Sequence, residues 1–141
     1  MKTIAIFVLG AFLQGCSVEP VPINYGSDQC HFCKMTIVDQ QHAAEIVTKK
    51  GRAYMFDAIE CMMNELKRRD EEDVQFFLVG DYSKPKELIN AKSAFYLISE
   101  EIPSPMGHNL SAFSMQSERR KFISEKSGEA LNWDDLKLKF K

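Results

Sequence analysis

Apolar positions follow strand-like and helix-like patterns in turn along the first half of the chain. Short stretches rich in β-branched and aromatic residues predict strands, and a Lys-Lys-Gly turn separates the first two. These strands are expected over Ala43 to Thr48, Arg52 to Phe56 and Val74 to Val79. Between the second and third, apolar residues recur every three or four positions from Ile59 to Leu66, which predicts a helix. Asp57 and Glu60 stand where a capping box would begin it.

The second half repeats this order faintly. The expected elements are a strand over Ala94 to Ser99, a strand over Leu110 to Phe113, a helix from about Ser117 to Lys126 and a last short strand beginning at Leu131. Asn132 is placed to cap a terminal turn that contains Trp133. Strands and helices mix without regular βαβ alternation. The pattern therefore predicts an α+β domain with mostly antiparallel sheet, built from two ββαβ-type units over residues 27–85 and 86–141.

The N-terminus has the order of a bacterial lipoprotein signal. Lys2 precedes an apolar run from Ile4 to Phe12, and Leu13-Gln14-Gly15-Cys16 resembles a lipobox. We expect residues 1–15 to be a signal peptide, Cys16 to be lipidated, and residues 16–26 to tether the lipid to a domain over 27–141. The alternative is an ordinary signal peptide with an unrelated cysteine. Either signal predicts export, and the lipidated form predicts a membrane-anchored protein of the bacterial cell envelope that faces the periplasm.

Charge and cysteine count narrow the function. The 141 residues carry a formal net charge of −2, which gives no bias toward nucleic acid. Once Cys16 is lipidated, three cysteines remain: Cys30, Cys33 and Cys61. An odd number in an oxidising compartment leaves at least one thiol outside any intramolecular disulfide. A metal site explains this set better than a purely structural disulfide.

The stretch Cys30-His31-Phe32-Cys33-Lys34-Met35 places two thiols and a thioether within six residues. Soft sulfur donors select Cu(I), and a thioether adds little to a zinc or iron–sulfur site, so copper is the first interpretation. Two alternatives stay open. One is a zinc-binding structural lipoprotein that uses the cysteines and a histidine. The other is a thiol–disulfide oxidoreductase that uses Cys30 and Cys33, although the β-branched residues after the pair predict no helix N-terminus there.

Four other side chains are weighed as ligands. Met106, in the loop Pro105-Met106-Gly107, is a candidate second thioether or a methionine folded onto the core. His108 beside it is a weaker candidate, because a single loop histidine is usually solvated, and His31 inside the CxxC is more often exposed than a ligand. Cys61, on the first turn of the expected helix, is a third candidate sulfur or a small core residue. The remaining internal methionines, Met55, Met62, Met63 and Met115, are interpreted as core.

These motifs together resemble the NosL family of copper lipoproteins, which are accessory to nitrous oxide reductase. The resemblance is carried by the lipobox, by the CxxCxM with Thr36-Ile37, by Tyr54-Met55-Phe56-Asp57-Ala58-Ile59-Glu60-Cys61-Met62, by Val79-Gly80-Asp81-Tyr82 and by Pro105-Met106-Gly107. They run in family order over nearly the whole chain after the signal. Lys34 stands where the family often has glycine, and Ala58 where it often has a second aspartate.

The resemblance implies a Cu(I) chaperone rather than an enzyme. It implies ligation by Cys30, Cys33, Met35 and Met106, delivery to the copper–sulfide cluster of nitrous oxide reductase in denitrification, and docking to an ABC-type membrane maturation complex. It also implies two ββαβ units like part of organomercurial lyase. That fold analogy leaves a carbon–mercury lyase using the cysteines and Asp57 as a further enzymatic alternative. We expect a monomer or a weak dimer.

Overall fold

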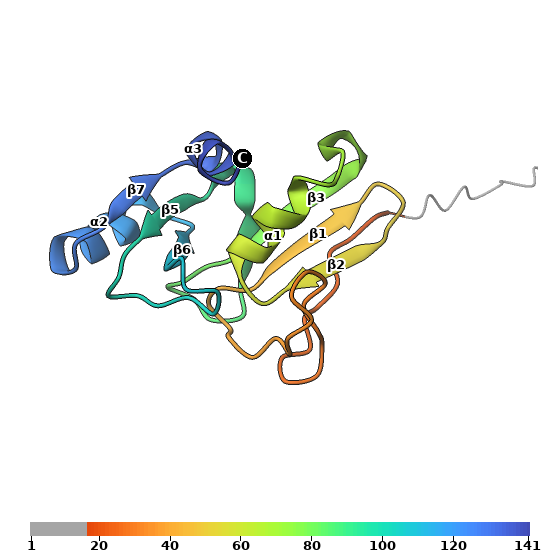
Figure 1. The fold of residues 1–141 in the computed structure, drawn as a ribbon, viewed down its shortest axis with the longest axis horizontal. Coiled ribbons are helices and arrows are strands. Elements are labelled where there is room, and N and C mark those ends of the chain that lie inside the picture. The colour runs from red at the N-terminus through yellow and green to blue at the C-terminus, as the bar shows by residue number, and fades with distance from the viewer. Residues whose placement is uncertain (1–16) are drawn as a thin grey trace, which may run out of the picture.

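The computed structural model describes residues 17–141, so the signal peptide and Cys16 lie outside the described residues. Figure 1 shows two small sheets side by side, with helices on their faces and at their ends. The first unit holds β1 (Ala44–Thr48), β2 (Ala53–Phe56), α1 (Ile59–Leu66), η1 (Glu71–Asp73), β3 (Val74–Gly80) and β4 (Leu88–Asn90). The second holds η2 (Ala91–Ser93), β5 (Phe95–Ile98), β6 (Leu110–Phe113), α2 (Gln116–Glu125), β7 (Glu129–Leu131) and α3 (Trp133–Lys139).

Every pair of neighbouring strands within the two sheets is antiparallel. The strand orders are β2-β1-β3-β4 and β6-β5-β7. The orders β1-β2-α1-β3 and β5-β6-α2-β7 confirm the predicted α+β fold of two ββαβ units. The first sheet extends past the expected division at residues 85 and 86, because β4 pairs with β3.

The two sheets meet where β3 and β6 approach each other. Asp81, directly after β3, forms a bridge with Ala112, and the Tyr82 N–H donates to the Ala112 carbonyl at 2.8 Å. His42 Nε2 lies 3.1 Å from Ser111 Oγ, and its Nδ1 lies 3.1 Å from the Asp39 carboxylate. Ser111 is fully buried. This Ser–His–Asp row therefore joins the two units and presents no nucleophile to solvent.

The main core lies between the inner face of the first sheet, α1 and the second unit. Ala44, Ile46 and Phe56 point into it, as the alternation along a strand requires, and the buried side of α1 covers them. Met62 and Met63 are buried there, which confirms their interpretation as core. Met115 is 46% exposed at the N-cap of α2, so its interpretation as core is wrong.

The segment expected to be a lipid tether is docked along part of its length. The Val21 N–H donates to Glu45 Oε1 at 2.8 Å, and Ile23 and Tyr25 pack against the main core. Glu45 is fully buried on the face of β1 opposite to Ala44 and Ile46, and burial raises its pKa. Residues 21–25 are thus part of the folded domain rather than a free linker. None of the helices over residues 17–141 has both the length and the apolar character needed to cross a membrane.

Candidate metal centre

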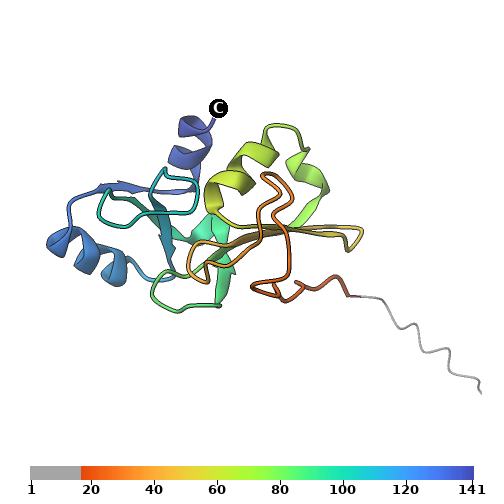
Figure 2. The ribbon, with the colours of Figure 1, turned by 60° about the horizontal axis from the view of Figure 1, so that its bottom comes forward.

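The thiol loop (residues 30–35) is a tight turn held by backbone hydrogen bonds. Gln29 and Thr36 form an antiparallel bridge at its base, and the Cys30 N–H donates to the Met35 carbonyl at 2.8 Å. The His31 N–H donates to the Met55 carbonyl at 2.7 Å, which fixes the loop to β2. Figure 2 views the first sheet nearly along its plane and shows this loop on the same side as α1. The loop is therefore rigidly placed beside the first turn of the helix.

Lys34 adopts a φ of +66°, in the left-handed region that disfavours a residue with a Cβ. The loop needs this conformation to close, and the Lys34 ammonium donates to the His31 carbonyl within the same turn. Lys34 replaces the glycine often found at this position in the resembled family. The backbone thus keeps the geometry that a glycine would adopt freely.

We predict that Lys34→Gly stabilises the folded protein by up to about 1 kcal/mol, because it removes left-handed strain from an exposed position. Urea unfolding of the reduced protein measures this change. Lys50→Gly, in the exposed turn after β1, is the matched control and is expected to be neutral or destabilising. A loss of stability in Lys34→Gly would contradict this account of the loop.

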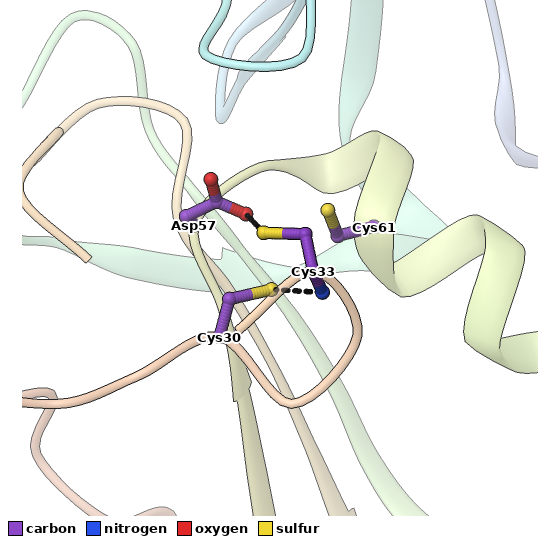
Figure 3. A group of neighbouring side chains, drawn as sticks. All are labelled: Cys30, Cys33, Asp57 and Cys61. Carbon is purple, nitrogen blue, oxygen red and sulfur yellow. Dashed lines mark hydrogen bonds between the residues drawn. The ribbon is translucent and has the colours of Figure 1, made fainter. Parts of the chain in front are cut away.

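The end of β2 brings the third sulfur to the loop. Asp57 follows the last residue of β2, and Cys61 lies four residues later on the first turn of α1. Donor atoms of Cys30, Cys33, Asp57 and Cys61 all lie within 4.8 Å of one another. Figure 3 shows the Cys33 sulfur between the Asp57 carboxylate and Cys61. All three thiols are free, and Cys30 and Cys61 are fully buried.

Hydrogen bonds order the protons in this cluster. The Cys33 thiol donates to Asp57 Oδ1 at 3.4 Å, and the Cys33 N–H points to Cys30 Sγ at 3.5 Å (Figure 3). The neighbouring Cys61 thiol is the main cause that lowers the pKa of Cys30 from 9.0 to about 6. Burial raises the pKa of Cys33 to about 11, and the neighbouring Cys30 sulfur followed by burial raises that of Cys61. The lowered pKa of Cys30 favours its thiolate, and the raised pKa values of Cys33 and Cys61 favour their thiol forms.

The carboxylates expected to cap α1 are used elsewhere, so the predicted capping box is wrong. The helix begins at Ile59 with Ala58 at its N-cap and no side-chain cap. Asp57 accepts a hydrogen bond from the Cys33 thiol, and buried Glu60 accepts one from the Ser104 hydroxyl. Both carboxylates are therefore hydrogen-bonded to residues distant in sequence and do not cap the helix.

The two expected thioethers differ in their exposure. Met35 closes the thiol loop, and its side chain is 54% exposed. Met106 is half-buried against the main core. Its loop is fixed to α1 through the Ser104–Glu60 hydrogen bond, one residue before Cys61. Met35 is thus available to an ion arriving from solvent, and Met106 belongs to a loop docked on the helix that carries Cys61.

Neither candidate histidine is among the mutually close donor atoms that the described residues offer. The His108 ring instead packs against Phe140, with its centroid 5.7 Å away. His31 points away from the thiols, with its ring 4.6 Å from that of Tyr54 and Nε2 3.7 Å from Glu65. The donor set that the fold assembles is three soft sulfurs and one carboxylate.

Comparison with known proteins agrees with this architecture. The chain is 25% identical over 150 residues to the copper-binding lipoprotein NosL of Stutzerimonas stutzeri, which covers 95% of this chain and 78% of that protein. The crystal structure of the copper chaperone NosL from Shewanella denitrificans superposes with a TM-score of 0.73. It is 22% identical and the match covers 84% of this chain and 96% of that one. At that identity the superposition shows a shared fold. The NosL family model matches residues 20–140, so the chain belongs to the NosL family.

Proposed function

We propose that this protein is a lipid-anchored, periplasm-facing Cu(I) chaperone whose cargo is held by the sulfurs of Cys30, Cys33 and Cys61. The observation that carries the proposal is the convergence of three thiols within 4.8 Å on one side of the first sheet. Sulfur donors of this kind favour Cu(I) over harder ions. The copper-binding lipoprotein and the copper chaperone among its relatives support the same cargo.

The asymmetry of the thiols suits capture and release. Cys33 is the partly exposed sulfur, whereas Cys30 and Cys61 are enclosed. An ion would meet Cys33 and the exposed Met35 thioether first, and the Cys30 thiolate behind them would complete the binding. A thioether is a neutral ligand without a proton to exchange. Met35 and Met106 are therefore proposed as exchange ligands rather than as permanent members of the site.

Delivery is proposed from the family and the expected anchor. We propose nitrous oxide reductase as the recipient and its ABC-type membrane maturation complex as the docking partner. Lipidation of Cys16 would hold the chaperone near such membrane partners and raise its effective concentration there.

Proton release on binding tests the three-sulfur site. Each thiol that must ionise to bind the metal adds one proton to the exchange, so affinity rises with pH. Cys30 is already ionised above its pKa of about 6, whereas Cys33 and Cys61 are protonated. Between about pH 7 and pH 9, we expect log K for Cu(I) to rise with a slope of about 2 per pH unit.

Anaerobic competition against a Cu(I) chelator, corrected for the chelator's own protonation, measures this slope. Cys33→Ser is the control: it keeps the Cys61 thiol that lowers the pKa of Cys30, so its slope is expected to fall to about 1. A slope of about 1 in the parent would mean that Cys61 stays protonated beside a two-sulfur site. A slope near zero would contradict ligation by either raised-pKa thiol.

One observation favours zinc as a second candidate cargo, because Asp57 could complete a four-ligand tetrahedral set with the three thiols. Cu(I) does not prefer carboxylate, so the two cargoes make opposite demands on Asp57. We predict that Asp57→Asn keeps Cu(I) affinity within about 10-fold, since the asparagine oxygen still accepts a hydrogen bond. A loss of Zn(II) affinity without a loss of Cu(I) affinity is expected. Equal, large losses for both ions would contradict the sulfur-only copper site.

The thiol arrangement also bears on the oxidoreductase alternative. Such an enzyme attacks its substrate with an accessible thiolate. Here the thiolate, Cys30, is fully buried, and the accessible sulfur, Cys33, has a raised pKa. This division suits metal binding better than attack on a protein disulfide.

A further inference from the structure

Positive side chains gather around the thiol loop, although the whole chain carries a net charge of −2. The cationic rim (Lys34, Arg52, Arg68 and Arg69) comes from the loop itself, the residue before β2 and the residues after α1. Three of its members lie over aromatic rings. Arg68 is 5.4 Å from the centroid of Phe32, and Arg52 and Arg69 are 4.9 Å and 3.9 Å from that of Tyr54. The rings therefore hold these charges at set positions beside the thiols.

Two guanidinium groups of the rim keep free hydrogen-bonding edges. Arg69 is paired with Glu65 at 2.8 Å. Within residues 17–141, neither Arg52 nor Arg68 has a carboxylate oxygen within 4.0 Å. Stacking uses the face of a guanidinium and leaves its N–H groups pointing outward, in the fork geometry that matches a carboxylate. Arg52 and Arg68 are thus positioned to bind acidic groups from another molecule.

A hollow of about 310 Å³ lies beside Lys34 and Arg52 of this rim, and Cys30 of the metal centre is among its lining residues. Its walls include Gln29, Cys30, His31, Lys34, Arg52 and Tyr54. Among residues 17–141, Asp28 is the one acidic side chain that lines it, and its carboxylate already accepts the Asn24 N–H at 2.7 Å. The hollow has room for a carboxylate side chain, and its charged walls favour one. Cys30, a member of the metal centre, belongs to this lining.

We infer that the cationic rim docks an acidic segment of the protein that exchanges copper with this chain, with a carboxylate side chain in the hollow. The inference rests on the proposed function for the exchange, but the docking itself needs no metal. An anionic bilayer is the competing occupant, since the chain is expected to carry a lipid anchor. The protein segment is favoured because a recessed hollow fits a single side chain, whereas a lipid surface needs projecting, mobile cations.

Binding of a model acidic peptide to the metal-free protein tests the docking. We expect acetylated, amidated tetraglutamate to shift the amide resonances of residues 29–34 and 52–55, and tetraglutamine to leave them unchanged. The double variant Arg52→Gln/Arg68→Gln should lose these shifts. Arg120→Gln/Lys121→Gln on α2 removes the same charge from another face and should keep them. Equal shifts in the two double variants, or none in the parent, would overturn the inference.

Vesicles separate the two occupants. We expect the parent without its lipid anchor to bind phosphatidylglycerol vesicles no more tightly than the Arg52→Gln/Arg68→Gln variant does. Vesicle binding that depends on Arg52 and Arg68, together with no response to the peptide, would assign the rim to the membrane and overturn the inference.

Copper exchange tests the consequence at the thiols. At low ionic strength, anionic bicinchoninate should remove Cu(I) from the parent about 10-fold faster than from the Arg52→Gln/Arg68→Gln variant. Uncharged neocuproine should remove it equally fast from both, and about 0.5 M NaCl should abolish the difference with bicinchoninate. Equal rates with bicinchoninate would overturn the role in exchange. If Cys33→Ser binds copper like the parent while the peptide shifts persist, the proposed copper site fails and the docking inference stands.

Discussion

Replacing Cys33 with serine is expected to lower Cu(I) affinity by more than about 100-fold. Residues that only support a metal ligand typically cost no more than about 100-fold when they are mutated, so a larger loss indicates direct ligation. The change removes a soft donor and its negative charge together, and serine oxygen does not replace either for Cu(I). Cys33 is partly exposed, and its thiol donates a single hydrogen bond to Asp57, so serine can be accommodated without a cavity. Anaerobic titration against a chelator of known affinity measures the loss.

Matched variants show whether the loss reflects the sulfur or the fold. The Cu(I) affinity of Cys61→Ser is expected to fall by a comparable factor, since the Cys61 sulfur on α1 lies within 4.8 Å of the other two sulfurs. Met62→Leu, the buried neighbour of Cys61, changes the core without touching the thiols and should bind Cu(I) like the parent. Met35→Leu and Met106→Leu should each weaken binding by less than about 10-fold, because each removes only a neutral donor. If Cys61→Ser binds Cu(I) like the parent while Cys33→Ser loses tight binding, the copper site has only two of the three sulfurs.

The elements around the site could be predicted because their patterns are strong and local. The strand, turn and strand before Phe56 and the helix that follows were expected from alternation and from apolar spacing, and β1, β2 and α1 confirm them. The predicted capping box was wrong for a tertiary reason. The Asp57 and Glu60 pattern is that of a capping box, but Cys33 and Ser104, distant in sequence, hold the two carboxylates. Sequence spacing alone cannot show such competition.

The site itself was only half visible in the sequence. The spacing of Cys30 and Cys33 predicted a metal site from the sequence. Cys61 joins them only because β2 and α1 bring residue 61 back to residue 30. Asp57 was not expected beside the thiols as a hydrogen-bond acceptor. Its position directly after a strand and one helical turn before a cysteine was the available signal. Exposure was also missed at Met115, which was expected in the core with Met62 but is 46% exposed.

Residues 21–25, before the thiol loop, were expected to be a tether but pack against the folded domain. Two prolines and weak periodicity over residues 18–25 suggested a flexible tether. Val21, Ile23 and Tyr25 nevertheless alternate, and the last two of these pack on the main core. The deciding partner is Glu45, whose buried carboxylate accepts the Val21 N–H. The alternation of Val21, Ile23 and Tyr25 therefore indicated an extended, packed segment, but its partner Glu45 is distant in sequence and could not be recognised from this pattern.

Oxidation of Cys30 and Cys33 to a disulfide is expected to remove tight Cu(I) binding completely and reversibly. The two thiols lose two protons and two electrons to an added oxidant such as diamide, which is reduced to its hydrazine. Their sulfurs lie within 4.8 Å in one turn, so a bond between them needs only local movement. Disulfide sulfurs do not ligate as thiolates, and Cys61 would remain as a single thiol. Copper binding should return when a dithiol reduces the bond.

The same disulfide separates the chaperone from an oxidoreductase. In a chaperone it is a blocked state, and bound Cu(I) should protect Cys30 and Cys33 from alkylation, as mass spectrometry of trapped thiols can show. In an oxidoreductase it is a working intermediate that exchanges rapidly with dithiols and substrate disulfides. Burial of the Cys30 thiolate and the raised pKa of the accessible Cys33 thiol predict slow exchange. Rapid catalytic turnover of a model disulfide by the metal-free protein, unchanged in Met35→Leu, would contradict the copper function and favour the redox one.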